Sequence, residues 1–183
     1  SIPFGFLFGR IYGKDVLKIG WKKTSGSNVF KNVGKIPGAL TGIFDLLKGY
    51  LAVFGAQKLG LSLTVQALSG VAAVIGHNWS IFIKFAGGRG IGTFIGGLWA
   101  LAPKILGLSI IPFLTVALIW NSSIGTLLFL VAVIFFSLNS NQFQSSGLYA
   151  LLVLPPILIK RLSPIKEIFQ SDRKTILFRS RIL

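Results

Sequence analysis

Two short polar segments of the sequence have residue types suited to binding anions. The first contains Ser27 and Asn28, preceded by Lys22 and Lys23 and followed by Lys31. Small loops rich in glycine and hydroxyls can turn successive N–H groups toward an anion, and nearby lysines add positive charge. The alternative interpretation is a solvated basic loop resting on anionic lipid, worth about 1 kcal/mol per Lys or Arg near the surface.

The second segment is a glycine turn ahead of an apolar stretch: Gly87, Gly88, Arg89 and Gly90, followed by Thr93. A glycine turn that opens a helix leaves N–H groups unpaired at the positive end of the helix dipole, which favours a phosphate. Arg89 can hold two phosphate oxygens with its planar guanidinium. The segment is not a nucleotide-binding P-loop, because the Gly-Lys-Ser/Thr ending is absent. Tight packing between helices is the alternative role of the glycines.

Three further ionisable residues, Asp45, Lys48 and His77, lie within apolar stretches. Ionisable groups at membrane depth are costly and commonly functional. Asp45 and Lys48 are three residues apart, so on a helix they partly neutralise each other. A structural ion pair is the alternative role for these two residues, and a hydrogen-bonded structural histidine is the alternative for His77.

The numbers of cysteine, histidine and acidic residues limit the kinds of reaction that this protein can catalyse. The 183 residues include no cysteine, one histidine and four acidic residues. The lack of cysteine excludes a thiolate nucleophile, a disulfide framework and a Cys-based zinc site. A single histidine excludes His-rich metal centres. We therefore expect no metal and no cofactor, and chemistry based on Lys, Arg, hydroxyl, amide and backbone N–H groups.

Hydropathy and charge indicate an all-α membrane protein. Hydrophobic residues make up 52% of the chain, and the mean hydropathy is +0.76. The chain contains 19 Lys and Arg but only 4 acidic residues. Soluble domains carry about a quarter charged residues with balanced signs. Nucleic-acid binders are also basic, but they lack several long stretches with almost no charge. We therefore expect a polytopic helical bundle in a membrane and no nucleic-acid partner.

The alternation of apolar and polar stretches predicts a single domain, residues 1–183, with about seven transmembrane spans. The predicted spans are residues 2–8, 43–63, 65–85, 91–102, 105–120, 124–138 and 147–159. The first is too short to cross a hydrocarbon core of roughly 30 Å, which takes about 20 residues, so we interpret it as the inner end of a truncated helix. Residues 10–36 are expected to form a basic cytoplasmic loop, and residues 160–183 a basic cytoplasmic tail.

The sign of the charges orients these spans. Seven alternating spans place 17 Lys and Arg on one side and only Lys58 and Lys104 on the other. Positively charged residues are retained on the cytoplasmic side of a membrane. We therefore predict an N-terminus outside, a C-terminus inside, and both anion-binding segments on the cytoplasmic face of the membrane.

These motifs, in this order, resemble those of the bacterial integral-membrane acyl-phosphate:glycerol-3-phosphate acyltransferases of the PlsY type. The stretches that carry the resemblance are residues 1–5, 27–35, 45–49 and 76–93. Weaker similarity extends over residues 123–126 and over Arg161 and Leu162 with Glu167. Together they cover most of the chain, and the ordered set is more specific than any one motif.

The resemblance implies transfer of a fatty acyl group from acyl phosphate to the 1-hydroxyl of glycerol 3-phosphate, giving lysophosphatidate and phosphate for phospholipid synthesis. It implies no protein nucleophile or base, because acyl phosphate is already activated and its phosphate takes the proton. The implied glycerol-phosphate ligands are Ser27, Asn28 and Lys31. The implied acyl-phosphate ligands are Gly87, Gly88, Arg89, Gly90 and Thr93. The implied supporting residues are Asp45, Lys48, His77 and Ser123. Membrane lipid is the remaining expected partner.

Four positions depart from the family pattern. Trp21, Ala86, Pro155 and Leu158 stand where the family carries serine, lysine, histidine and asparagine. A substrate oxygen left without its hydrogen-bond partner costs about 1–3 kcal/mol. The alternative functions are therefore an inactive or redirected relative that binds lipid or acyl phosphate, and a membrane transporter.

Overall fold

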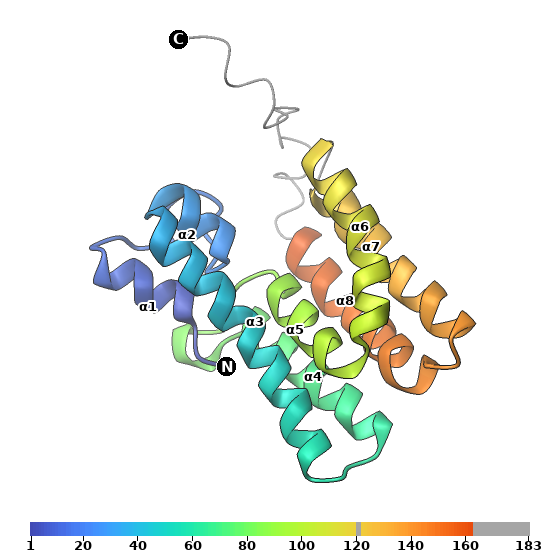
Figure 1. The fold of residues 1–183 in the computed structure, drawn as a ribbon. Helices are drawn as coiled ribbons and strands as arrows, with labels where there is room; N and C mark the ends of the chain where they lie inside the picture. The colour runs from blue at the N-terminus through green and yellow to red at the C-terminus, as the bar shows by residue number, and fades with distance from the viewer. Residues whose placement is uncertain (120–121, 163–183) are drawn as a thin grey trace.

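The computed structural model describes residues 1–119 and 122–162, and within these ranges the regular secondary structure is helical (Figure 1). The α-helices are α1 (Phe4–Ile11), α2 (Gly26–Asn32), α3 (Lys35–Lys58), α4 (Leu63–Asn78), α5 (Ile91–Leu101), α6 (Pro103–Ile119), α7 (Ser122–Asn139) and α8 (Leu148–Leu162). A 3-10 turn covers Ile81–Ile83, and a π-helical turn covers Phe143–Gly147. Glu167 and most of the predicted tail lie outside the described residues, as does Asn121.

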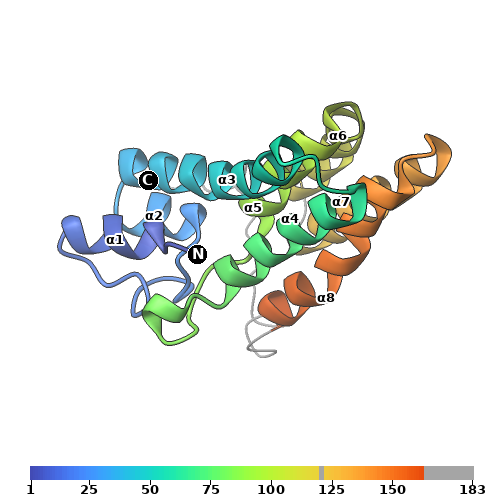
Figure 2. The ribbon, with the colours of Figure 1, turned by 90° about the horizontal axis from the view of Figure 1, so that it is seen from below.

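Helices α3 to α8 form an antiparallel bundle, and α1 and α2 pack beside the first half of α3 (Figures 1 and 2). Helices α3 and α5 make the most extensive helix–helix contact of the described chain. Their backbones approach closely because Gly49 faces the Thr93 carbonyl and Gly96 faces the Leu46 carbonyl, where any larger side chain would collide. This crossing fixes the start of α5 relative to α3.

The hydrophobic core lies between α4, α5, α7 and α8. Phe94, Phe129 and Tyr149 are fully buried at its centre, with ring centroids 5.5 Å apart for Phe94–Phe129 and 4.9 Å apart for Phe94–Tyr149. Edge-to-face and offset aromatic pairs of this kind add about 0.5–1.5 kcal/mol beyond their burial. The core therefore ties the C-terminal helices to α5.

Three helical segments are long and apolar enough to cross a membrane: Lys35–Lys58, Ser122–Asn139 and Phe143–Arg161. Ile91–Leu101 and Pro103–Ala117 are shorter apolar segments. The helical, membrane-type composition of the fold is thus confirmed. Each of the seven predicted apolar stretches corresponds mainly to one helix of the set α1 and α3 to α8, although the stretch 43–63 also reaches the first residue of α4. Seven membrane crossings and the orientation of the termini remain predictions.

Several predicted boundaries are wrong. The basic segment 10–36 is not a loop throughout, since it contains α2 and the start of α3. Helix α3 begins eight residues before the predicted span, because Pro37 fits the first turn of a helix and its carbonyl accepts a 2.7 Å hydrogen bond from the Thr41 hydroxyl. In contrast, the predicted break between residues 102 and 105 is confirmed by the end of α5 and the start of α6 at Pro103.

The third predicted span is too long. Helix α4 ends at Asn78, and the chain then folds back on itself, since Ser80 accepts backbone hydrogen bonds from Ile83 and Phe85 and donates one to Ala86. Lys84 and Phe85 take left-handed backbone conformations in this turn. Near the C-terminus, α8 continues to Leu162, so the first residues of the predicted tail belong to a helix.

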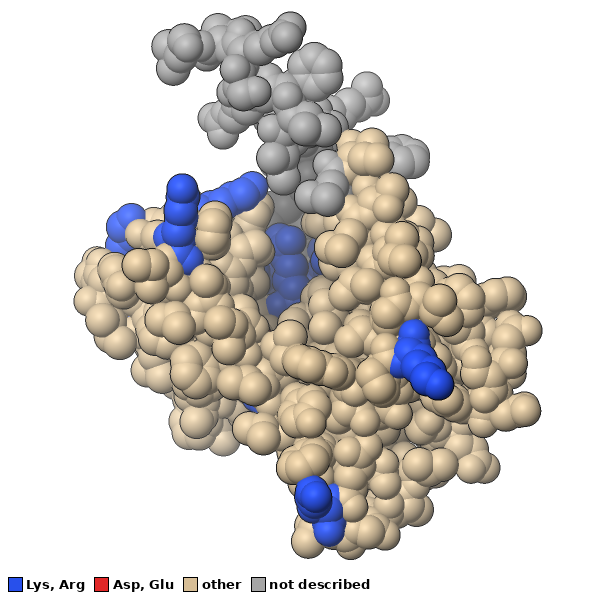
Figure 3. Space-filling view, viewed as in Figure 1, with Lys and Arg blue, Asp and Glu red and all other residues tan. Residues whose placement is uncertain are grey.

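Positive side chains collect at one end of the bundle. Figure 3 shows Lys and Arg around and inside a hollow between the α2 and α6 sides of the molecule, with no acidic side chain on this face. Lys58 and Lys104 lie at the opposite end, where α3 finishes, α6 begins, and the Gln57 amide donates to the Ala100 carbonyl at 2.9 Å. Within the described ranges, Lys58 and Lys104 are thus separated from the cations around the hollow, as the charge pattern predicts. We call the end that carries Lys31, Arg89 and Arg161 the cationic end.

Candidate active site

Asn28 organises the loop between α1 and α2. Its side chain is fully buried, and its Nδ2 group donates to the carbonyls of Val16 at 3.1 Å and Lys23 at 2.8 Å. Its Oδ1 atom accepts from the Trp21 N–H and from the Asn32 amide, both at 2.9 Å. The structure thus uses the Asn28 amide to hold the loop, whereas the sequence assigned it to direct substrate contact. Ser27, at the start of α2, is exposed.

Trp21 brings the two predicted anion-binding segments together. The Lys31 Nζ atom lies 4.8 Å from the centroid of the Trp21 ring, and the Arg89 guanidinium carbon lies 5.2 Å from the same centroid. The backbone supports this contact, because the Thr24 N–H donates to the Gly87 carbonyl at 3.2 Å. The two segments therefore lie side by side, and the residue between them, Trp21, is one that departs from the family pattern.

The glycine turn opens α5 as predicted. Gly90 caps the helix with a left-handed backbone, at φ 79°, and the first backbone bond of the helix runs from the Phe94 N–H to the Gly90 carbonyl at 2.8 Å. The N–H groups of the first turn therefore have no acceptor within the helix. Gly88 donates to the His77 carbonyl at 3.1 Å and lies directly against the His77 ring. The glycine turn therefore packs on the C-terminal end of α4, at His77.

Thr93 lies one turn deeper in α5. It is fully buried at the α3–α5 crossing, and its carbonyl accepts a long hydrogen bond, 3.4 Å, from the Tyr149 hydroxyl. Its own hydroxyl is buried and has no hydrogen-bond partner among the described residues. Thr93 is therefore positioned beneath the glycine turn rather than on its surface.

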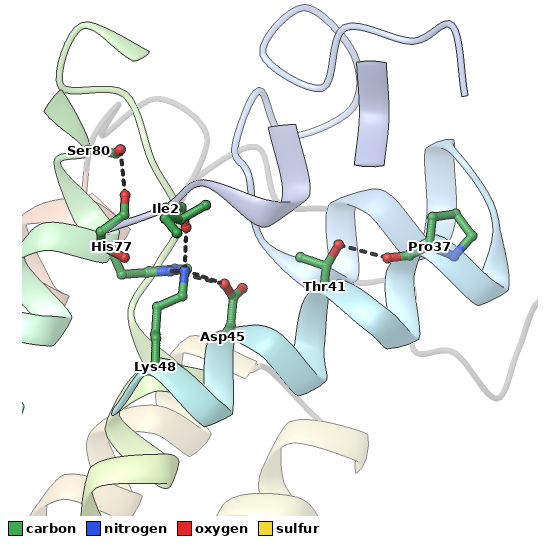
Figure 4. Close-up of polar contacts among 8 residues, drawn as sticks. Ile2, Pro37, Thr41, Asp45, Lys48, His77 and Ser80 are labelled. Atoms are coloured by element: carbon green, nitrogen blue, oxygen red, sulfur yellow. Dashed lines mark hydrogen bonds and ion pairs between the residues drawn. The ribbon is translucent and has the colours of Figure 1, made fainter. Parts of the chain in front are cut away.

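Asp45, Lys48 and His77 form one buried cluster (Figure 4). The Asp45 Oδ1 atom lies 2.9 Å from Lys48 Nζ and 3.4 Å from His77 Nδ1. Lys48 also donates to the Ile2 carbonyl at 2.9 Å, and the Ser80 hydroxyl donates to the Ser1 carbonyl at 2.8 Å. The ion pair considered from the sequence is thus present. The cluster joins the start of the chain to α3 and α4 and supports the ring on which Gly88 lies.

The C-terminal end of α8 supplies a further cation. Arg161 donates to the Ser123 hydroxyl of α7 at 2.8 Å, and it is close enough to Arg89 for the two positive charges to interact. The buried Arg161 Nε atom has no hydrogen-bond partner in the described part of the chain. Asn78 holds α8 in place, donating to the Pro156 carbonyl at 3.0 Å. Sequence reasoning did not place Arg161 in the site, because a Lys-Arg pair after an apolar stretch is also typical of a membrane boundary.

A hollow of about 570 Å³ lies elsewhere, lined by Leu63, Leu101, Leu138 and the polar turn before α8. Leu63 begins α4 and Leu101 ends α5, so this hollow is at the end opposite to His77 and Ile91. It is therefore separate from Lys31, Arg89 and Arg161. The cationic end combines Lys31, Arg89 and Arg161 with the N–H groups of a helix start, which have no acceptor within the helix. Cations and such N–H groups are the groups that proteins use to bind phosphate.

The fold is that of a helical membrane protein, with a cluster of cations at one end of the bundle. The sequence profile of the family "Glycerol-3-phosphate acyltransferase" matches residues 1–171. The chain is 35% identical to the glycerol-3-phosphate acyltransferase of Trichlorobacter lovleyi over 92% of this chain and 87% of that protein. The chain belongs to the glycerol-3-phosphate acyltransferase family.

Other comparisons agree. Identity to glycerol-3-phosphate acyltransferase 1 of Deinococcus radiodurans is 43% over 66% of this chain, and the matched segment spans 60% of that relative's length. The fold is similar to the crystal structure of PlsY (YgiH), described as an integral membrane glycerol 3-phosphate acyltransferase, in its glycerol 3-phosphate form. That similarity has a TM-score of 0.84 and 23% identity, and covers 97% of this chain and 92% of the other. The lysophosphatidic acid form gives a TM-score of 0.82.

Proposed function

We propose that this protein transfers a fatty acyl group from acyl phosphate to the 1-hydroxyl of glycerol 3-phosphate, forming lysophosphatidate and inorganic phosphate. Membership of the family supports this activity. The observation that carries it is the meeting of Lys31 and Arg89 at the Trp21 ring, with Arg161 near Arg89. Two substrates that each carry a phosphate need several cations in one place, and the chain provides them.

The reaction requires charge stabilisation and positioning. The 1-hydroxyl oxygen attacks the acyl carbon, the bond between that carbon and the phosphate oxygen breaks, and the hydroxyl proton passes to the departing phosphate. Arg89 and the N–H groups at the start of α5 would stabilise the negative charge of the donor. Holding both substrates in reactive geometry replaces a bimolecular encounter, a contribution of about 7–11 kcal/mol in favourable cases.

The proposed binding roles follow the two segments. Ser27 and Lys31 would take the glycerol phosphate, with Asn28 acting through the loop that it holds. Gly87, Gly88, Arg89 and Gly90 would take the acyl phosphate, with Thr93 beneath them. Asp45, Lys48, His77 and Ser123 are positioning residues in this proposal.

We also propose that the protein lies in the bacterial cytoplasmic membrane with seven spans, its N-terminus outside and its site on the cytoplasmic face. The relatives are bacterial proteins. The charge distribution supports the orientation, because Lys58 and Lys104 lie at the end of the bundle opposite to Lys31, Arg89 and Arg161.

The test uses purified protein with palmitoyl phosphate and glycerol 3-phosphate, and follows phosphate release. We expect release that depends on glycerol 3-phosphate and a lysophosphatidate product of matching amount. Lys104→Ala, which changes a cation at the far end, should leave the rate unchanged. If phosphate release never depends on glycerol 3-phosphate, the activity is refuted and the redirected lipid- or acyl-phosphate-binding relative is favoured.

A further inference from the structure

The segment between α4 and α5, residues 80–86, exposes three large apolar side chains although it is not part of a long apolar helix. Ile81, Phe82 and Phe85 are 68%, 65% and 63% exposed, respectively. We call this segment the 80–86 loop, and Figures 1 and 2 show it at the edge of the molecule, next to α1. Its side chains have no role in the proposed function.

Contacts at both ends of the 80–86 loop hold its shape. The Ser80 N–H donates to the Ala86 carbonyl at 2.9 Å and closes the loop, and the Phe85 N–H donates to the Ser80 carbonyl at 2.9 Å. Trp79, the residue before the loop, lies against α8, because the Nζ atom of the buried Lys160 is 5.1 Å from its ring centroid. The exposed apolar side chains thus belong to a fixed loop.

The backbone of the loop is locally unfavourable. Lys84 and Phe85 both have left-handed conformations, with φ of 55° and 59°. This region is disfavoured for residues that carry a Cβ atom, and strain of this kind is common in functional segments. The conformation leaves both side chains exposed, so a cationic group and an aromatic group follow each other on the surface of the loop.

The loop starts close to the boundary of the apolar part of the bundle. His77, in the last turn of α4, has its Nδ1 atom 3.4 Å from Asp45 Oδ1. Asp45 lies in α3 just after Ile43, where the long apolar stretch of that helix begins. Since the 80–86 loop starts three residues after His77, it leaves the apolar part of the bundle at the end that carries the glycine turn.

Two physical requirements favour the surface of a bilayer as the surroundings of such a loop. Exposed apolar side chains gain free energy when they leave water, in proportion to their area. Irregular backbone that faces lipid is excluded from the hydrocarbon core, because its polar groups find no partners there. Both requirements are met where headgroups give way to acyl chains, and a lysine at this depth extends its ammonium toward the lipid phosphates.

The loop is also continuous with the glycine turn. Ala86 precedes Gly87, whose carbonyl accepts from the Thr24 N–H at 3.2 Å, and the Gly88 N–H donates to the His77 carbonyl at 3.1 Å. Both glycines are buried, and both lie against the end of α4. The depth of the loop in a bilayer therefore determines the depth of the turn.

We propose that the 80–86 loop inserts Ile81, Phe82 and Phe85 at the boundary between lipid headgroups and acyl chains, and thereby holds the glycine turn at the depth of the lipid phosphates. An acyl phosphate dissolved in the bilayer carries its own phosphate at this depth, so it reaches the turn without leaving the membrane. The insertion rests on the exposure and position of the loop, whereas the benefit for the acyl donor rests on the proposed function.

The first experiment measures the depth of the loop with a nitroxide label in vesicles of phosphatidylcholine and phosphatidylglycerol. The chain contains no cysteine, so each single-cysteine variant carries one label. Phe82→Cys is compared with Lys18→Cys, in the exposed segment before α2, and with Leu51→Cys, on the exposed side of α3. Collisions with oxygen report lipid, and collisions with a water-soluble nickel chelate report water.

We expect the label at position 82 to meet the chelate several times less often than the label at position 18, and to lie less deep than the label at position 51. Equal access of the chelate to positions 82 and 18 overturns the insertion. Spin–spin broadening at position 82 also overturns it, because a second copy of the chain then covers the loop. These outcomes do not depend on turnover.

The second experiment compares a long-chain donor with a water-soluble one. Phe82→Ser should raise the KM for palmitoyl phosphate about tenfold, because apolar burial in the bilayer is lost. The KM values for butyryl phosphate and glycerol 3-phosphate should not change. Phe82→Leu keeps an apolar side chain and should behave as the native protein does. Leu59→Ser, which changes an exposed apolar residue at the far end of α3, is the matched control and should leave all three values unchanged.

The two experiments separate the two parts of the proposal. A KM that rises equally for palmitoyl and butyryl phosphate overturns the role of the loop in donor supply. If the native protein shows no turnover while the label at position 82 lies at the lipid boundary, the insertion stands and the proposed acyl transfer fails.

Discussion

The guanidinium carbon of Arg89 lies 5.2 Å from the centroid of the Trp21 ring, across 68 positions of sequence. Lys31 lies 4.8 Å from the same centroid. A cation on an indole gains about 0.5–1 kcal/mol when exposed and more when desolvated, so the ring holds both groups in place against their mutual repulsion. Trp21 therefore maintains the cations of the site, although it replaces a hydroxyl that the family uses.

Arg89 is the first residue to test. Arg89→Ala should lower acyl transfer about 10- to 100-fold, because charge-assisted hydrogen bonds contribute about 1.5–3 kcal/mol each. Arg89→Lys keeps the positive charge and should retain more activity than the alanine variant. The measurement is glycerol 3-phosphate-dependent phosphate release. Equal rates for Arg89→Ala and the far-end control Lys104→Ala would remove Arg89 from the site.

Trp21 should report substrate binding by its fluorescence. When a phosphate binds Lys31 and Arg89, these cations exchange the ring face for phosphate oxygens, and the environment of the indole changes. Titration with glycerol 3-phosphate should therefore shift the emission of the native protein, and Trp21→Phe should lose that shift. The other tryptophans remain in Trp21→Phe, so an unchanged shift in this variant would contradict the assignment.

Gly88 should not tolerate a side chain. A Cβ atom at this position would collide with the His77 ring, so Gly88→Ala must displace either the ring or the glycine turn. We expect a loss of about 1–3 kcal/mol in stability from overpacking and a raised KM for acyl phosphate. Gly107→Ala is the matched control, because a Cβ atom there meets no other group. The comparison uses thermal unfolding together with initial rates.

Asn28 should act on the site through the loop. Asn28→Ala removes hydrogen bonds to Val16, Lys23, Trp21 and Asn32, each worth about 1 kcal/mol. We expect a lower unfolding temperature and faster hydrogen exchange over residues 16–23. Asn139→Ala, which removes one exposed bond to the Phe135 carbonyl, should change neither. Loss of activity in Asn28→Ala without faster exchange would instead indicate direct substrate contact.

The general fold follows from the sequence because apolar stretches and one-signed charge are long-range patterns that many residues repeat. The helix boundaries do not follow from the sequence in this way, since each depends on the backbone conformation of one or two residues. The reversal after Asn78 needs two left-handed residues, Lys84 and Phe85, which hydropathy does not reveal. Helix α2 was not predicted, because the small and polar residues of this short helix are equally typical of a loop.

The sequence indicates which residue types belong to the candidate site, but it does not reveal most of the contacts between them. Lys31 and Arg89 stand out because glycine, hydroxyl or amide groups surround them. Their common partner, Trp21, interrupts the family motif. Nothing in the sequence around Trp21 indicates that two cations contact its ring. Lys160 resembles any cation at the end of a membrane helix, and only its burial against Trp79 distinguishes it. In both places, at Trp21 and at Lys160, the contact joins segments that are far apart in the sequence, and local sequence patterns do not report such contacts.

The hollow at the cationic end also has a kinetic consequence. Charges of one sign inside a hollow concentrate the electric field at its mouth, and such fields raise association rates of oppositely charged ligands by 10- to about 1000-fold. Dianions arriving from the aqueous phase would be drawn toward Arg89 before any specific contact forms. Dissolved salt weakens this attraction within a distance of about 8–10 Å, so the capture of dilute substrate is tied to the ionic strength of the surrounding solution.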